Sequence, residues 1–241
     1  MNQYDVILWD VDDTLLDFGM SERHAFQVTA ERFGWHPGEA EYRLYSDINN
    51  RHWKMLECGL ITMEQVKYLR FEALFRELHM DSVSIQDFQE HYQEELGNVF
   101  FIRDHSDEVM RQLRGICRQY LVTNGNAATQ RHKLVLSGLD LLAEDLFISE
   151  ELGYPKPDVR FFEEVFRRIT QCGRERVLIV GDSLTSDMQG GRNAGIRTCY
   201  YNPQGAVNTA PEKCDYESGT LAEVIDIVRG TSAAKTSAER G

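Results

Sequence analysis

Short runs of apolar, β-branched and aromatic residues recur along the chain and predict five strands. Two of these runs, Asp5–Trp9 and Val177–Gly181, are almost continuously apolar, as strands are when both faces of a parallel sheet are covered. The other predicted strands are Gln119–Thr123, Leu146–Ser149 and Arg197–Tyr201. Helical patterns separate the later strands and cover Ser106–Arg114, Ala127–Ser137, Asp158–Ile169 and Leu184–Ala194. This alternation predicts an α/β fold with a doubly wound, Rossmann-like parallel sheet.

The long stretch between the first strand and Ser106 interrupts this alternation, because it contains no convincing strand pattern. It predicts four helices instead, over Ser21–Phe33, Glu39–Glu57, Met63–Leu78 and Ile85–Leu96. Thr62 and Gln65 form a capping-box pattern at the start of the third. We therefore expect an inserted helical domain over residues 19–102 and an α/β core formed by residues 1–18 and 103–229. The tail, residues 230–241, lacks apolar periodicity and is predicted to be disordered.

Composition and charge narrow the classes of function. The 241 residues are 42% hydrophobic and 27% charged, which is ordinary for a globular protein. No apolar run reaches the roughly 18–20 residues that span a bilayer, so we expect no membrane partner. The five cysteines form no CxxC pair, which favours reduced thiols and a cytoplasmic protein. A net charge of −13 disfavours a nucleic-acid polymer as partner, although one small anion could still bind in a locally positive pocket.

Carboxylates follow both of the most apolar strands. The first strand leads into Asp10, Asp12 and Asp13, and the fourth is followed by Asp182 and Asp187. A polar turn would explain one such acid, but three acids within four residues repel one another, and a cation would relieve that repulsion. Ligands of open α/β sheets sit beyond the carboxyl ends of the strands. Oxygen ligands with no histidine or cysteine nearby favour Mg²⁺ over zinc.

Two further motifs place polar groups near the same predicted edge of the sheet. Thr123 and Asn124 end the second strand, and Lys156 lies between Pro155 and Pro157, which restrain its backbone. Each motif alone is compatible with an ordinary turn or a surface loop. These ordinary interpretations become weaker when both motifs are taken together with the acids.

The order of these motifs, over Asp5–Ala194, resembles that of the haloacid dehalogenase-like hydrolases: Asp-x-Asp-x-Thr, a threonine after the second strand, Lys-Pro, and Gly-Asp-Ser-x-x-x-Asp. The resemblance implies that the helical insert is the cap of that superfamily's first subclass. It implies a Mg²⁺-dependent phosphomonoester hydrolase that passes through an aspartyl-phosphate. Asp13 departs from the small residue often found before the motif threonine.

The resemblance also implies a role for each motif residue. Asp10 would be the nucleophile and Asp12 the general acid and base. Thr123, Asn124 and Lys156 would bind the phosphate, with Lys156 also balancing charge at the nucleophile. The metal would be held by Asp10, Asp12 and Asp182, with Asp187 orienting metal-bound water or Lys156. Members of the superfamily that cleave carbon–halogen or carbon–phosphorus bonds lack an aspartate at the position of Asp12, so a phosphatase or phosphomutase is favoured.

Further segments are similar to the pyrimidine 5′-nucleotidases, including those that act on noncanonical nucleotides: Trp53–Thr62, Arg70–Phe71, Ile148–Gly153 and Asp187–Gly195. This similarity implies hydrolysis of nucleoside monophosphates such as UMP, dUMP or dTMP. Phe18, Trp53 and Phe71 are candidates to stack on the base, although each could instead pack in a core. Arg160 and Arg192 lie near motifs and could equally be solvated.

Three alternatives stay open at this stage. A phosphatase for a sugar phosphate or a phosphoglycolate-type metabolite fits the same motifs, and so does a phosphomutase. A phosphoacceptor signalling module of the CheY type also carries clustered acids with a threonine and a lysine. The helical insert and the Gly-Asp-Ser-x-x-x-Asp motif disfavour that module. The sequence leaves the oligomeric state open.

Overall fold

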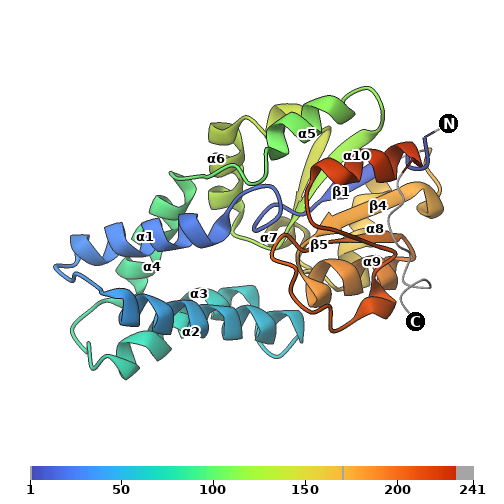
Figure 1. The fold of residues 1–241 in the computed structure, drawn as a ribbon. Coiled ribbons are helices and arrows are strands. Elements are labelled where there is room, and N and C mark those ends of the chain that lie inside the picture. Colours follow the sequence, from blue (N-terminus) through green and yellow to red (C-terminus); the bar gives the residue numbers. More distant parts are fainter. Residues whose placement is uncertain (1, 170, 232–241) are drawn as a thin grey trace.

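A computed structural model describes residues 2–169 and 171–231 and shows a parallel sheet flanked by helices (Figure 1). The sheet has six strands in the order β3-β2-β1-β4-β5-β6. Their bounds are β1 Val6–Trp9, β2 Arg118–Thr123, β3 Asp145–Ile148, β4 Val177–Gly181, β5 Arg197–Tyr201 and β6 Tyr216–Ser218. The strand order reverses at β1, so the predicted doubly wound α/β fold is confirmed.

The sheet is covered on both faces, and the alternation of side chains along β1 shows how. Trp9 belongs to an apolar cluster with residues of α5 (Ser106–Leu113) and α10 (Ala222–Arg229). Leu8 points the other way, into a cluster with residues of α8 (Val159–Arg168). The remaining core helices are α6 (Ala127–Ser137), α7 (Ser149–Leu152) and α9 (Gln189–Ala194). Burial on both faces explains why the central strands read as continuous apolar runs.

Several predicted elements begin or end at other residues in the structure, two of them because the chain changes type there, and one strand was not predicted. The strand predicted to end at Ser149 ends at Ile148, because Ser149 already starts α7. The helix predicted from Leu184 begins with a π-helical turn, Leu184–Met188, before α9. Strand β6 was missed because its three residues, Tyr-Glu-Ser, carry no apolar run.

Four helices form a separate body to one side of the sheet (Figure 1): α1 Phe18–Arg32, α2 Glu39–Glu57, α3 Met63–Glu77 and α4 Ile85–Gly97. They share their own apolar core, in which aromatic rings stack on one another. The ring of Phe71 is fully buried there and stacks on Tyr45, with 5.6 Å between the ring centroids. The prediction that Phe71 could stack on a substrate base is therefore wrong, because that ring is already packed inside the helical domain.

A buried polar network joins the four helices, with one residue from each. The Arg70 guanidinium donates to Oδ1 of Asn49 and to Oε1 of Gln89, both at 2.9 Å. Asn49 in turn donates to Oε1 of Glu22 at 2.6 Å. All four side chains are almost completely buried. The network therefore places a guanidinium and a carboxylate inside an otherwise apolar core.

Replacing Arg70 with methionine is expected to lower the free energy of unfolding by about 3 kcal/mol, because it leaves buried polar partners unpaired. Urea unfolding followed by circular dichroism measures the loss. Arg76→Met is the matched control, since Arg76 lies on the same helix and is exposed. Equal losses in the two variants would contradict a stabilising role for the network.

The chain crosses between sheet and helical body twice, and the two crossings are tied together. Leu16 and Ile102 form an antiparallel bridge. The Arg103 guanidinium contacts the carboxylates of Asp13 at 3.3 Å and Asp17 at 3.1 Å. The division at residues 19 and 102 stays a prediction. The tail predicted to be disordered lies, from residue 232 onward, outside the described residues. Within the described ranges, no helix has the length and apolarity needed to cross a membrane.

Candidate active site

All seven predicted site residues line one cavity of about 180 Å³. Its floor is the carboxyl edge of the sheet, where β1 leads into Asp10, β2 ends at Thr123 and β4 leads into Asp182. The adjacent strands place these ends side by side, since β1 pairs with both β2 and β4. The lining residues are Asp10, Asp12, Asp13, Phe18, Asn50, Trp53, Lys54, Glu57, Thr123, Asn124, Lys156, Asp182, Ser183, Ser186 and Asp187.

The ammonium group of Lys156 is buried at the centre of this floor. Its Nζ donates to Oδ1 of Asp10 at 2.6 Å, to Oδ1 of Asp187 at 2.7 Å and to the carbonyl of Val122 at 3.0 Å. The lysine is 1% exposed, so these three acceptors take the place of water. Lys156 therefore forms a buried ion pair with Asp10, and its role in balancing charge at a nucleophile stays a prediction.

The side chain of Asn124 holds the Lys156 loop. Its Nδ2 donates to the carbonyl of Lys156, and its Oδ1 accepts from the Lys156 main-chain N–H, both at 2.8 Å. Asn124 was predicted to bind phosphate, but the structure engages both ends of its amide in fixing the lysine. The role of Asn124 in binding phosphate stays a prediction.

Three carboxylates gather where a cation could bind. One oxygen from each of Asp10, Asp182 and Asp187 lies within 4.8 Å of the others. The glycine before Asp182 makes room for this group, since a Cβ on Gly181 would lie 2.3 Å from Cγ of Asp187. An all-oxygen donor set of this kind suits Mg²⁺. Asp12, which was also predicted as a ligand, is not part of this group, and its role as a metal ligand stays a prediction.

Burial and mutual repulsion dominate the electrostatics of this group. Burial, together with the carboxylate of Asp187, raises the pKa of Asp10 to about 7. Burial and the carboxylate of Asp10 raise the pKa of Asp182 well above its ordinary value. Burial acts to lower the pKa of Lys156, but the carboxylates of Asp10 and Asp187 outweigh it and raise that pKa. Three acids against one lysine leave excess negative charge that a divalent cation would neutralise.

The carboxylate of Asp12 is held by two residues that sequence reasoning missed. Lys133 Nζ donates to Oδ1 of Asp12, and Gln130 Nε2 donates to Oδ2, both at 2.5 Å. Both donors lie on α6, the helix that follows Thr123, and both are buried. The sequence does indicate that these two side chains are neighbours, because residues three apart lie on the same face of a helix.

One face of α2 forms the roof of the cavity. Asn50, Trp53, Lys54 and Glu57 follow the helical spacing of three, four and seven residues, and all four line it. Lys54 Nζ donates to Oγ1 of Thr185 at 2.5 Å, and that hydroxyl donates to Oε2 of Glu57 at 2.5 Å. The cap and the core are thus hydrogen-bonded across the site. Two predicted base-stacking candidates, Phe18 and Trp53, face the cavity.

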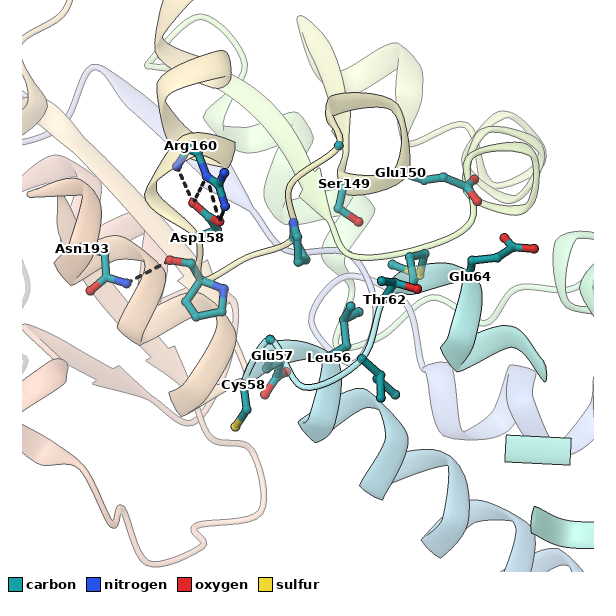
Figure 2. A pocket seen from close by; sticks show the side chains of 16 residues that line it. Leu56, Glu57, Cys58, Thr62, Glu64, Ser149, Glu150, Asp158, Arg160 and Asn193 are labelled. Atoms are coloured by element: carbon teal, nitrogen blue, oxygen red, sulfur yellow. Dashed lines mark hydrogen bonds and ion pairs between the residues drawn. The ribbon is translucent and has the colours of Figure 1, made fainter. Parts of the chain in front are cut away.

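A larger cleft of about 690 Å³ lies beside the site, between the Leu56–Glu64 segment of the cap and the Ser149–Arg160 segment of the core (Figure 2). Arg160 lies at this cleft and pairs with Asp158, as Figure 2 shows. Arg192 donates to the carbonyl of Glu212 at 2.6 Å. Neither arginine lines the cavity that holds the seven predicted site residues, so neither has a contact there that supports a role in phosphate binding.

Comparison with known proteins shows what this chain is similar to. YfnB of Bacillus subtilis, which is named as a HAD-hydrolase, is 34% identical to this chain over 95% of this chain and 97% of its own length. A crystal structure of YfnB bound to magnesium superimposes with a TM-score of 0.88, at 35% identity over 94% of this chain and 99% of the other. The pyrimidine 5′-nucleotidase PynA of Streptococcus pneumoniae is 32% identical over 92% of this chain and 94% of its own length.

A second nucleotidase relative is the pyrimidine 5′-nucleotidase YjjG of Escherichia coli, 28% identical over 83% of this chain and 87% of its own length. The sequence model of the haloacid dehalogenase-like hydrolases matches residues 4–195, which include both acidic motifs and the helical insert. The resemblance expected from the motifs is confirmed. The chain belongs to the haloacid dehalogenase-like hydrolase family.

Proposed function

We propose that this protein is a Mg²⁺-dependent phosphomonoester hydrolase whose nucleophile is Asp10. The observation that carries the proposal is the geometry around that side chain. Its Oδ1 accepts from the buried ammonium of Lys156, and the carboxylates of Asp182 and Asp187 lie beside it at the cavity floor. In the described part of the chain, no hydrogen bond reaches Oδ2 of Asp10, which leaves that oxygen available to attack a phosphorus atom.

Asp10 and Asp182 would hold the cation, with Asp187 beside them. Bound Mg²⁺ would neutralise the repulsion between the carboxylates and a phosphate dianion and help to align the phosphate. Lys156 fixes the orientation of Asp10 and adds positive charge where the transferring phosphoryl group gathers negative charge. Thr123, buried at the end of β2, offers a hydroxyl to a phosphate oxygen.

The reaction would take two steps. Oδ2 of Asp10 bonds to phosphorus while the bond from phosphorus to the leaving oxygen breaks, and Asp12 gives that oxygen a proton. Asp12, now a carboxylate, then takes a proton from water as the water attacks the acyl-phosphate. The second step releases phosphate and restores both aspartates. General acid–base catalysis of this kind contributes about 10²–10⁴ in rate.

The substrates we propose are pyrimidine nucleoside monophosphates such as UMP, dUMP and dTMP. Support comes from the two relatives named pyrimidine 5′-nucleotidases and from the roof of the cavity. Trp53 and Phe18 offer aromatic surfaces there, which suit a planar base. The exposed amide of Asn50 adds a donor and an acceptor.

A substrate panel tests this assignment. We expect kcat/KM for UMP, dUMP and dTMP to exceed that for purine nucleotides and sugar phosphates by about tenfold or more, which corresponds to about 1.4 kcal/mol of extra binding to the base. Release of inorganic phosphate is the measurement, made with Mg²⁺ present and with EDTA.

The other outcomes of the panel separate the alternatives. Turnover confined to sugar phosphates or phosphoglycolate would keep the mechanism and contradict the nucleotidase assignment. An isomerised phosphate ester without free phosphate would indicate a phosphomutase. A chain that is phosphorylated but turns over no ester would indicate a phosphoacceptor module.

A further inference from the structure

Lys133 is an unusual residue for the place it occupies. Its side chain is 1% exposed on the inner face of α6, although lysines are rarely buried unless a partner offsets the loss of hydration. In the part of the chain that the structure describes, its one ion pair joins Nζ to Oδ1 of Asp12 at 2.5 Å. Nζ also lies over the ring of Phe18, 5.9 Å from its centroid. The charge of Lys133 is therefore directed at Asp12.

Gln130 holds the second oxygen of the same carboxylate. Its Nε2 donates to Oδ2 of Asp12 at 2.5 Å, while its buried Oε1 has no hydrogen-bond partner among the described residues. The preceding turn leaves room for this side chain, since a Cβ on Gly125 would lie 2.6 Å from Nε2 of Gln130. The third residue of the Thr-Asn-Gly motif is therefore a glycine at the point where the Gln130 side chain passes close to the backbone.

The helix that carries both donors is itself anchored. Asn126 caps α6 by accepting from the main chain of Thr129 at 3.1 Å. The Thr129 hydroxyl donates to Oε1 of Gln93, on α4, at 2.8 Å. The two donors therefore project from a fixed helix onto the two oxygens of one carboxylate, which sets both the position and the plane of that group.

We propose that Lys133 and Gln130 are positioning residues that hold the Asp12 carboxyl group in line with the leaving oxygen of the substrate. The inference rests on the proposed role of Asp12 as general acid and base. An aspartate held by only one hydrogen bond can still rotate about its two side-chain torsions. Proton transfer needs the carboxyl oxygen within about 2.6–3.2 Å of the leaving oxygen. Two donors from one rigid helix remove that freedom and keep the carboxylate apart from the Asp10, Asp182 and Asp187 oxygens.

The dependence on the leaving group distinguishes positioning from a structural role. An alkyl phosphate needs a proton on its departing alkoxide, whereas p-nitrophenyl phosphate releases a stable phenolate without one. Lys133→Met is expected to lower kcat/KM for the fastest alkyl phosphate of the panel by about 10²-fold, the lower end of general acid catalysis. For p-nitrophenyl phosphate, we expect a change of less than about threefold, because the proton contributes little to that step. Retained formation of p-nitrophenolate in the first step also shows that the variant folds.

Three further variants complete the test. Gln130→Leu is expected to lower kcat/KM for the alkyl phosphate by less than Lys133→Met does, and Asp12→Asn is expected to lower it by more. In both variants, kcat/KM for p-nitrophenyl phosphate should change little. Lys213→Met is the matched control, a lysine outside the catalytic cavity, and leaves both substrates unaffected. If Lys133→Met lowers kcat/KM equally for both esters, or for neither, the positioning role is overturned. If Asp12→Asn itself shows no dependence on the leaving group, the acid role of Asp12 and the inference fall together.

Discussion

Asp10→Asn is expected to lower kcat by about 10⁴-fold or more on every phosphomonoester that the protein hydrolyses, because the amide cannot form the acyl-phosphate. The substitution keeps the shape of the side chain, so an oxygen can still accept from Lys156. The lost activity then reports the chemistry of the carboxylate rather than its packing. Phosphate release from the best substrate, followed over a long incubation with high enzyme concentration, measures the residual rate.

Asp81→Asn is the matched control, since Asp81 is exposed in the cap and lies outside the cavity. It should retain the activity of the unmodified protein. Residual turnover by Asp10→Asn within about tenfold of the unmodified protein would rule out Asp10 as the nucleophile.

Removal of the divalent cation is expected to have the next largest effect. EDTA should abolish phosphate release, and Asp182→Asn should lower it by at least about 10²-fold, since even residues that only support a metal ligand cost 10–100-fold. Mg²⁺ should also stabilise the unmodified protein by about 2.7 kcal/mol at 100 times its dissociation constant, seen as a rise in melting temperature. That rise should disappear in Asp182→Asn. Full turnover after exhaustive chelation would contradict the metal site.

The affinity for Mg²⁺ should increase as the pH rises. Burial and the carboxylate of Asp187 raise the pKa of Asp10 to about 7 in the metal-free protein. Below that pH, Asp10 carries a proton that the cation must displace, whereas above it the carboxylate is free to bind. The melting-temperature rise with Mg²⁺ should therefore be smaller at about pH 6 than at about pH 8. A rise that is independent of pH would contradict Asp10 as a ligand.

The core of the fold was predictable because its strands are buried on both faces. Val177–Gly181 was predicted with its observed bounds, since an apolar run that ends in Gly-Asp has few other interpretations. Strand β6 was not predictable, because Tyr216–Ser218 pairs at the edge of the sheet and carries no apolar pattern. Its place depends on the neighbouring β5, which no local pattern reveals.

The site was predictable where the chemistry is local in sequence. Asp10, Lys156 and Asp182 were predicted because each stands in a motif, and the structure brings these three residues to one cavity at the edge of the parallel sheet. Lys133 and Gln130 were missed because a helix usually carries such residues on its solvated face. Phe71 was wrongly included as a stacking candidate, since an aromatic residue in a cap helix gives no sign of whether it faces the substrate or the cap core.

The most direct test of the central claim is to detect phosphate on Asp10. In Asp12→Asn with p-nitrophenyl phosphate, the first step needs no proton while the second lacks its base, so the intermediate should accumulate. We expect a burst of p-nitrophenolate that matches the enzyme concentration, and, after acid quenching and proteolysis, one phosphoryl group on the peptide that contains Asp10. Steady release of phosphate without a burst, and with no phosphoryl group on that peptide, would contradict the aspartyl-phosphate mechanism.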